Sequence, residues 1–155
     1  MNTSEKQTLL DHLTRWEQSR PPPLDPTVYT SFAFLTNALV AFVSGYPMYA
    51  LLFATLFKTS ILFRLYPSTV TFLFDKVAVN AVVGYGGYLL YQRLSELNLV
   101  WIVTIVSTFV VTVYLFYYGY MTNTYCYDKK KTTQLHYHSL LHLISSFGHH
   151  LIVLA

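Results

Sequence analysis

Charged side chains are scarce in this chain. Of its 155 residues, only 11% are Asp, Glu, Lys or Arg, whereas 54% are hydrophobic and 17% are aromatic. Soluble domains have about a quarter of their residues charged. This composition therefore predicts an integral membrane protein with little room for a second, soluble domain. The formal net charge of +3 is too small and too dispersed to predict a nucleic-acid partner.

Cysteine and sequence motifs for catalysis are almost absent as well. The single cysteine, Cys126, excludes an internal disulfide and a cysteine-based zinc site, and we interpret it as a structural residue in a loop. The sequence contains no Gly-rich phosphate loop, no nucleophile elbow and no redox motif. These absences leave the histidines and carboxylates of the chain as the candidates for chemistry.

The first 27 residues predict an amphipathic interfacial helix followed by a proline-rich linker. Over residues 1–20, apolar residues form a stripe on one face of the predicted helix, and charged residues occupy the rest of its surface. This pattern is typical of a helix that lies on a membrane surface or on a partner protein. The stripe comprises Leu9, Leu10, Leu13 and Trp16. Pro21, Pro22 and Pro23 end this helix and form a stiff, extended spacer. Residues 28–155 then form the transmembrane domain.

Five apolar runs follow, and each approaches the ~20 residues that a helix needs to cross a ~30 Å bilayer core. The predicted fold is therefore an all-α, polytopic bundle of about five transmembrane helices, over residues 28–46, 48–66, 70–91, 97–120 and 135–155. Tyrosines gather near the run ends, as in an aromatic belt at the membrane interface; they are Tyr46, Tyr49, Tyr66, Tyr88, Tyr91, Tyr117, Tyr118 and Tyr120.

The third run contains the segment Val82–Gly86, Val-Val-Gly-Tyr-Gly, which imitates the selectivity filter of a potassium channel. A filter requires a re-entrant loop between two helices, whereas this segment lies inside a long apolar run. We interpret the small residues Ala81, Gly84 and Gly87 as positions of close helix packing, and Asn80 as an interhelical hydrogen-bond donor.

Loop charges predict the orientation in the membrane. Five spans place the N-terminus and the loops after the second and fourth runs on one side. Most basic residues lie on that side, namely Lys6, Arg15, Arg20, Arg64 and Lys129–Lys131, whereas the other side has essentially Arg93 alone. The positive-inside rule therefore predicts a cytoplasmic or matrix-side N-terminus, in a membrane that the sequence does not identify; an organelle and a virion both remain open.

Histidines mark the fifth run. As a helix, this run places His138, His142, Ser145 and His149 along one stripe, while His136 and His150 point elsewhere. Ionisable groups at membrane depth are costly unless they face protein or water. On the same membrane side, the second run ends with Ser60 and Arg64, and the third run opens with Asp75 and Lys76. We therefore expect Ser60, Arg64, Asp75, His138 and His142 to share a pocket.

These residues resemble the motifs of the CREST superfamily, which includes alkaline ceramidases, progestin/adipoQ receptors and lipases that remodel GPI anchors. The matching segments are Ser60-Ile61-Leu62-Phe63-Arg64, Asp75 fifteen residues after Ser60, and His138-Ser139-Leu140-Leu141-His142-Leu143. The resemblance implies a membrane-embedded, zinc-dependent hydrolase of lipid amides or esters. In that scheme His138 and His142 would be metal ligands, while Asp75 and Ser60 would be catalytic residues that hold and activate water.

This chain departs from the family at one ligand and in its number of spans. Arg64 stands where the family has its first ligand histidine, and five runs replace the usual seven spans. A guanidinium cannot ligate a cation, so we expect Arg64 and Asp75 to form a structural ion pair.

Two functions remain open. The first is an accessory subunit of a larger membrane assembly, with lipids and other membrane subunits as partners, an altered CREST-like site and no cofactor. The alternative is a zinc-dependent lipid hydrolase that uses His138, His142 and Asp75.

Overall fold

The computed structural model describes Asp11 and residues 25–155. The predicted amphipathic helix over residues 1–20, apart from Asp11, and the spacer Pro21–Pro23 lie outside the described residues. Across the described part of the chain, the secondary structure is helical and contains no strand, which confirms the predicted all-α class.

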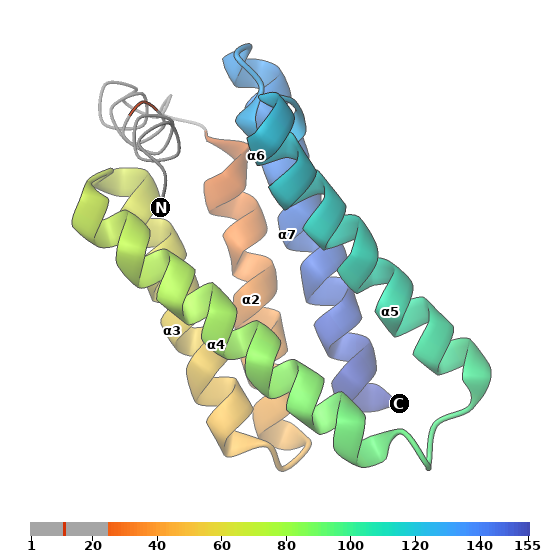
Figure 1. The fold of residues 1–155 in the computed structure, drawn as a ribbon. Coiled ribbons are helices and arrows are strands. Elements are labelled where there is room, and N and C mark those ends of the chain that lie inside the picture. Colours follow the sequence, from red (N-terminus) through yellow and green to blue (C-terminus); the bar gives the residue numbers. More distant parts are fainter. Residues whose placement is uncertain (1–10, 12–24) are drawn as a thin grey trace.

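Five long helical segments form the bundle (Figure 1): α2 (Pro26–Val43), α3 (Pro47–Leu65), α4 (Thr69–Arg93), α5 (Leu99–Val113) and α7 (Lys131–Leu154). The α5 helix continues through the π-helix η1 (Tyr114–Tyr118) into α6 (Gly119–Thr122), and the short 3-10 helix η2 (Tyr125–Tyr127) leads into α7. Helices α2, α3 and the continuous segment Leu99–Thr122 are long and apolar enough to cross a membrane, which is consistent with a membrane protein.

Local sequence signals set the helix starts. The Asp25 carboxylate accepts a hydrogen bond from the backbone N–H of Thr27 at 2.8 Å and so caps α2. Pro47 occupies the first turn of α3, where its missing N–H costs nothing. A capping box between Ser68 and Thr71 begins α4, and the Asn98 side chain caps α5. The predicted runs therefore match the long helices to within a few residues.

The helices are arranged so that α2 packs between α3 and α7, while α4 flanks α3 and α5 flanks α7. Successive helices run in opposite directions, so α2, α4 and α7 begin at the same end of the bundle, where α3 and α6 finish (Figure 1). At the opposite end Arg93 donates a hydrogen bond to the carbonyl of Ile152 at 2.7 Å, which joins the C-terminal turns of α4 and α7.

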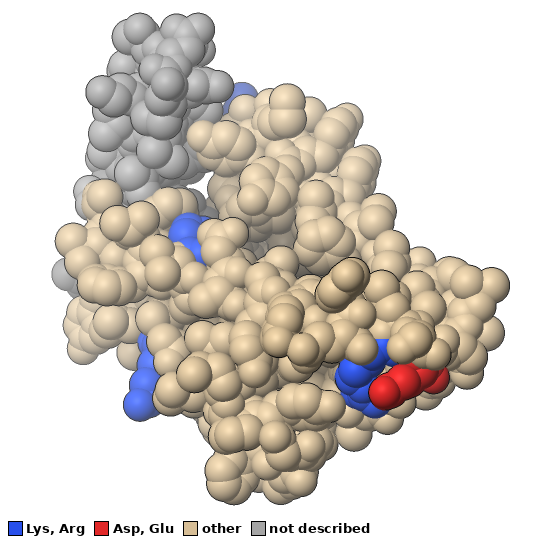
Figure 2. Space-filling model, turned by 60° about the horizontal axis from the view of Figure 1, so that its bottom comes forward, with Lys and Arg blue, Asp and Glu red and all other residues tan. Residues whose placement is uncertain are grey.

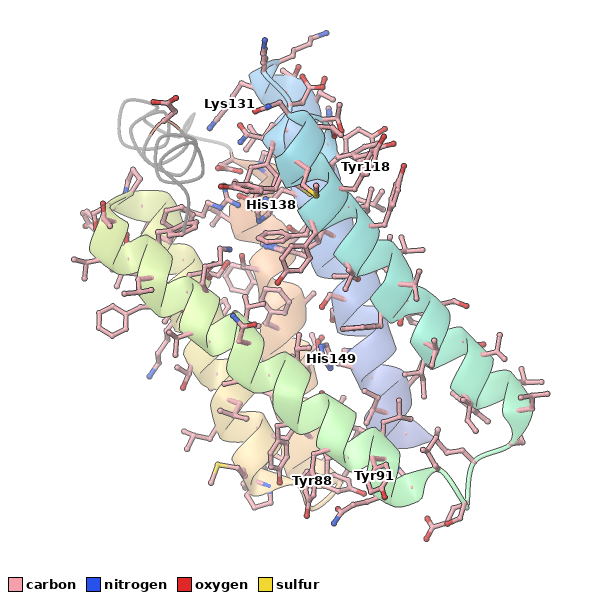
Figure 3. All side chains as sticks on the ribbon, in the orientation of Figure 1. Tyr88, Tyr91, Tyr118, Lys131, His138 and His149 are labelled. Atoms are coloured by element: carbon pink, nitrogen blue, oxygen red, sulfur yellow. The ribbon has the colours of Figure 1, made fainter. Side chains whose placement is uncertain are left out.

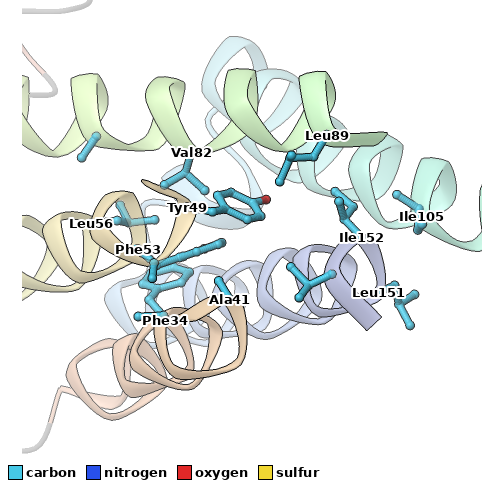
Figure 4. Packing of buried hydrophobic residues seen from close by; sticks show 14 residues of the cluster. Phe34, Ala41, Tyr49, Phe53, Leu56, Val82, Leu89, Ile105, Leu151 and Ile152 are labelled. Carbon is cyan, nitrogen blue, oxygen red and sulfur yellow. The ribbon is translucent and has the colours of Figure 1, made fainter. Parts of the chain in front are cut away.

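The core lies where α2, α3, α4 and α7 meet. Figure 4 shows Tyr49, Phe53 and Val82 packed together with Ile152 near Leu89. Tyr49 is completely buried, so its assignment to an interfacial belt was wrong; an apolar ring with a single polar atom fits this position because its hydroxyl finds a partner inside the bundle. Among the other predicted belt residues, Tyr66, Tyr88, Tyr91, Tyr117 and Tyr118 are exposed.

Close packing on α4 occurs at a glycine other than those predicted. A Cβ atom added to Gly84 or Gly87 would meet no atom within 4 Å, so these residues do not bring helices together. At Gly86 an added Cβ would collide with the Tyr49 hydroxyl and lie 3.0 Å from Nδ1 of His149. The helix phase explains the difference, because Gly86 is on the buried face of α4 whereas Gly84 and Gly87 are exposed.

Asn80 does not form the predicted interhelical hydrogen bond. Its exposed amide donates to the carbonyl of Lys76, one turn earlier in the same helix, at 2.8 Å. This local bond satisfies the amide without a partner helix.

The outer surface is largely apolar. Figure 2 shows a face dominated by uncharged side chains, with few Lys, Arg, Asp or Glu residues. The continuous helix Leu99–Thr122 is the extreme case, since only 11% of its most apolar window is buried within the chain. Its exposed residues include Leu99, Val100, Val103, Phe109 and Val110. Such a surface requires lipid or protein neighbours rather than water.

Candidate functional site: a buried polar cluster

The five residues predicted to share a pocket are all buried at one end of the bundle. Ser60 and Arg64 come from the last turns of α3, Asp75 from the second turn of α4, and His138 and His142 from the first half of α7. Each side chain retains less than a tenth of its accessible surface. We refer to these five residues as the polar cluster.

Hydroxyl groups of α2 connect the cluster to the rest of the bundle. The Ser60 and Ser31 hydroxyl oxygens lie 3.2 Å apart, and Ser31 donates to the carbonyl of Thr27 at 2.7 Å. Nδ1 of His142 lies 3.2 Å from the Thr30 hydroxyl, so the first turns of α2 bind both α3 and α7. The fully buried Thr27 and Ser31 thereby satisfy polar groups that lipid could not.

The two histidines lie edge to face, with ring centroids 5.0 Å apart and planes at 81°. This arrangement follows from their i, i+4 spacing on one face of α7. The ring of His142 also packs against Phe34 of α2, with centroids 4.9 Å apart. Figure 3 shows His138 in the half of α7 that begins at Lys131, and His149 in the other half.

Arg64 is the charged centre of the cluster. The carboxylates of Asp25 and Asp75 both act on its guanidinium electrostatically. Arg64 in turn acts on both His138 and His142. These interactions link four of the five predicted residues, and the Ser60–Ser31 contact places the fifth beside the first turns of α2.

The Asp75 carboxylate forms a salt bridge with the next residue in the chain, Lys76. Nζ of Lys76 lies 2.9 Å from the Asp75 carboxylate. Lys76 also lies 5.3 Å from the ring centroid of Phe72 and 5.0 Å from that of Phe116, which belongs to the π-helix. A direct Arg64–Asp75 ion pair stays a prediction. Lys76 belongs to this charged group as well, although it was not among the five residues expected to share the pocket.

The loop before α7 contributes two buried residues that act electrostatically on Arg64, namely Cys126 and Tyr127. Cys126 is fully buried and Tyr127 nearly so, and the Tyr127 ring packs edge-on against Phe116 at 5.4 Å. Burial raises the pKa of the Cys126 thiol to about 12, although Arg64 and Lys76 act in the opposite direction. Burial also raises the pKa of Tyr127. Both groups are therefore neutral at physiological pH, which fits the structural role predicted for Cys126.

Sequence reasoning missed Asp25, Thr30 and Ser31 as neighbours of the cluster. A signal for Asp25 was present, because Asp followed by Pro is a common way to begin a helix. Thr27 and Ser31 are four positions apart and so share a helix face. The predicted helix began at residue 28 and therefore did not include Asp25 or Thr27.

The residues present do not fit a three-ligand zinc site. Among residues 25–155 and Asp11, no three His, Cys, Asp or Glu side chains converge in an arrangement that could hold a metal ion. The guanidinium of Arg64 lies in the electrostatic environment of both histidines and would repel a divalent cation.

A second polar group lies deeper in the bundle. The hydroxyl of Tyr49 on α3 is hydrogen-bonded to Nδ1 of His149 on α7. Nearby, the Asn37 amide of α2 donates to the carbonyl of Ser146 at 2.9 Å and lies 2.9 Å from Nδ1 of His150. The Ser146 hydroxyl completes this network by donating to the Asn37 side-chain oxygen. Polar contacts therefore follow α7 from His138 to His150.

Comparisons of this chain with models of protein families, with curated proteins and with solved structures find no match. The resemblance to the CREST superfamily rests on the three short segments alone and stays a prediction.

Proposed function

We propose that this chain is an integral membrane protein that crosses the bilayer five times and acts as a structural, accessory subunit of a larger membrane assembly. The observation that carries this proposal is the contrast between the two sides of its helices. Buried and partly buried polar contacts bind α2, α3 and α7 to one another, whereas the Leu99–Thr122 segment leaves most of its apolar surface uncovered.

The polar cluster has a structural role in this account. Buried polar groups in a membrane protein stabilise one helix arrangement, because a displaced helix would leave them without partners. The CREST resemblance implies a ligand histidine at the position of Arg64. A guanidinium there supports a non-catalytic role, because it cannot ligate a metal and is attracted to the carboxylates of Asp25 and Asp75. No cofactor is needed for such a role.

The mass of the native particle tests the proposal. The chain would be isolated from its own membrane at native abundance in a mild detergent, and the mass of the protein component would be measured. We expect a particle several times heavier than the 17.9 kDa chain, with other subunits in fixed ratio. Recovery of a free monomer would contradict an accessory role.

A zinc-dependent lipid hydrolase is the second candidate, and the shared burial of Ser60, Asp75, His138 and His142 at one end favours it. Its test is the variant Arg64→His, with Arg64→Gln as the matched control, because both remove the guanidinium but only one supplies an imidazole. If the pocket derives from a metal site, Arg64→His binds zinc in stoichiometric amount, as measured by metal analysis after dialysis. Equal zinc content in the two variants would argue against this kinship.

A further inference from the structure

Three consecutive lysines mark the end of the bundle that contains the polar cluster. Lys129 and Lys130 are exposed in the loop before α7, and Lys131 is the half-buried first residue of that helix. Figure 3 shows Lys131 at this end, with Tyr118 on the adjacent segment. We refer to Lys129, Lys130 and Lys131 as the basic rim.

Most of the negative charge near the basic rim is already engaged. Asp25 accepts hydrogen bonds from Thr27, and Asp75 pairs with Lys76. The Asp128 carboxylate accepts a hydrogen bond from the backbone N–H of Lys130 at 2.7 Å. In the described part of this end, the five cations Arg64, Lys76 and Lys129–Lys131 outnumber the four carboxylates of Asp11, Asp25, Asp75 and Asp128. The α4–α5 connection at the opposite end carries one charge of each sign, Arg93 and Glu96.

The positive potential extends from the rim into the bundle. Arg64 and Lys131 act on each other electrostatically, and Asp25 moderates the field at Lys131. The rim is therefore the exposed part of a larger basic region rather than an isolated charge run. An anion that approaches Lys129 and Lys130 experiences the attraction of the buried guanidinium as well.

Tyrosines next to the rim indicate its depth in the membrane. Tyr114 and Tyr118 are about half exposed, and their rings stack with centroids 4.9 Å apart. The Tyr114 hydroxyl lies 3.2 Å from that of Tyr125, whose ring packs edge-on against Tyr137 of α7. Tyrosine rings prefer the level of lipid headgroups, where the ring is in an apolar region and the hydroxyl is hydrated. This places the basic rim at headgroup level.

We propose that the basic rim binds the headgroup of an anionic phospholipid, with Lys129 and Lys130 in contact with its phosphate and the tyrosines beside it in the interfacial region. The rim presents two exposed ammonium groups at the depth where such phosphates lie, next to a helix that enters the apolar layer. This inference depends on membrane insertion but not on the role as an accessory subunit.

Lipid binding to the full-length chain in detergent tests the inference. Phosphatidylglycerol and phosphatidylcholine would be titrated separately, and retained lipid would be counted by native mass spectrometry. The double variant Lys129→Gln/Lys130→Gln removes both exposed charges. Lys58→Gln is the control, because Lys58 is an exposed lysine on α3 outside the rim.

We expect phosphatidylglycerol to bind in preference to phosphatidylcholine, and the preference to fall by about 25-fold in the double variant, at about fivefold per lysine. The Lys58→Gln variant keeps the preference of the native chain. Equal retention of the two lipids, or an unchanged preference in the double variant with native helicity, would overturn the inference. Competition by inorganic phosphate without any preference between lipids would assign the rim to a soluble anion instead.

A salt titration of the native chain makes the test independent of the variants. Contacts between exposed charges weaken as the Debye length falls from about 10 Å at 0.1 M salt to about 3 Å at 1 M. The preference for phosphatidylglycerol should fall over this range. A preference that does not respond to salt would contradict a site formed by Lys129 and Lys130.

Discussion

The hydroxyl of Tyr49 is hydrogen-bonded to Nδ1 of His149, and this contact joins α3 to α7 beneath Gly86 of α4. Tyr49→Phe removes the hydroxyl but keeps the ring in the core, so it leaves the imidazole nitrogen without its partner. We expect the free energy of unfolding to fall by about 0.5–2 kcal/mol. Thermal unfolding in detergent, followed by circular dichroism, would measure the loss. Tyr91→Phe is the control on an exposed ring, and an equal effect in both variants would contradict this role of Tyr49.

Glycine substitutions on α4 test the packing directly. In Gly86→Ala the added methyl group collides with the Tyr49 hydroxyl, and we expect destabilisation by about 1–3 kcal/mol. In Gly84→Ala the methyl group meets nothing, so the higher helix propensity of alanine should leave the stability unchanged or raise it by up to about 1 kcal/mol. Unfolding midpoints of the two variants would decide the matter, since the same loss in both would show that the α3–α4 contact is placed incorrectly.

The coupling between Arg64 and Asp75 can be measured by a double-mutant cycle. Arg64→Gln and Asp75→Asn each remove one charge from a buried group. If the two side chains form the predicted ion pair, each single change should cost about 3 kcal/mol, because the charge that stays behind loses a main partner and keeps only Asp25 or Lys76. The double variant should lose less stability than the sum of the two single losses. Additive losses would exclude the predicted structural ion pair and would leave Lys76 as the partner of Asp75.

The buried thiol of Cys126 should resist modification. Full burial and a pKa raised to about 12 leave almost no reactive thiolate at pH 8. N-ethylmaleimide labelling of the folded chain should be slower by about 100-fold or more than labelling in denaturant. An exposed cysteine introduced as Ser95→Cys in a Cys126→Ala background supplies the reference rate. Comparable rates for the two thiols in the folded state would show that Cys126 is accessible.

The same pKa predicts how stability depends on pH. The folded chain keeps the proton on Cys126 up to about pH 12, whereas the unfolded chain releases it at its lower, ordinary value. Between these two values the folded state binds more protons, so stability should fall as the pH rises and should be unaffected by this group at lower pH. Cys126→Ala should lack the part of this loss that begins near the ordinary thiol pKa, whereas the buried Tyr127, whose pKa is also raised, should still lower stability at higher pH. Unfolding midpoints across the alkaline range measure both parts.

The helices were predictable from local signals, whereas their partners were not. Pro47, Ser68 and Asn98 each mark a helix start that is independent of tertiary structure. The inward direction of His138 and His142 followed from their spacing and from the cost of burying polar groups in lipid. The helix starts and the spacing of the two histidines each depend on only a few neighbouring residues, so both can be read from the sequence.

Contacts between helices required the rotation of each helix about its axis. Gly84, Gly86 and Gly87 are the same residue type within four positions of α4, but only Gly86 lies on the buried face. Tyr49 is one of eight tyrosines near run ends, and its burial depends on His149, which is 100 residues away. The π-helix over Tyr114–Tyr118 has no sequence signal that we recognise, yet it presents Phe116 to Lys76. Such features result from tertiary packing.

Membrane topology tests the central claim, a five-span bundle, most directly. Helices α2, α3 and Leu99–Thr122 are long and apolar enough to cross a membrane. Helices α4 and α7 carry more charged and polar residues, so their insertion is the part of the five-span account that needs a test. Single cysteines would replace Tyr66 and Ser95 on either side of α4, and Lys130 and Ala155 on either side of α7, in a Cys126→Ala background. In sealed vesicles a membrane-impermeant maleimide should label Tyr66→Cys and Lys130→Cys from one side, and Ser95→Cys and Ala155→Cys from the other. Labelling of both members of either pair from the same side would contradict the five-span account.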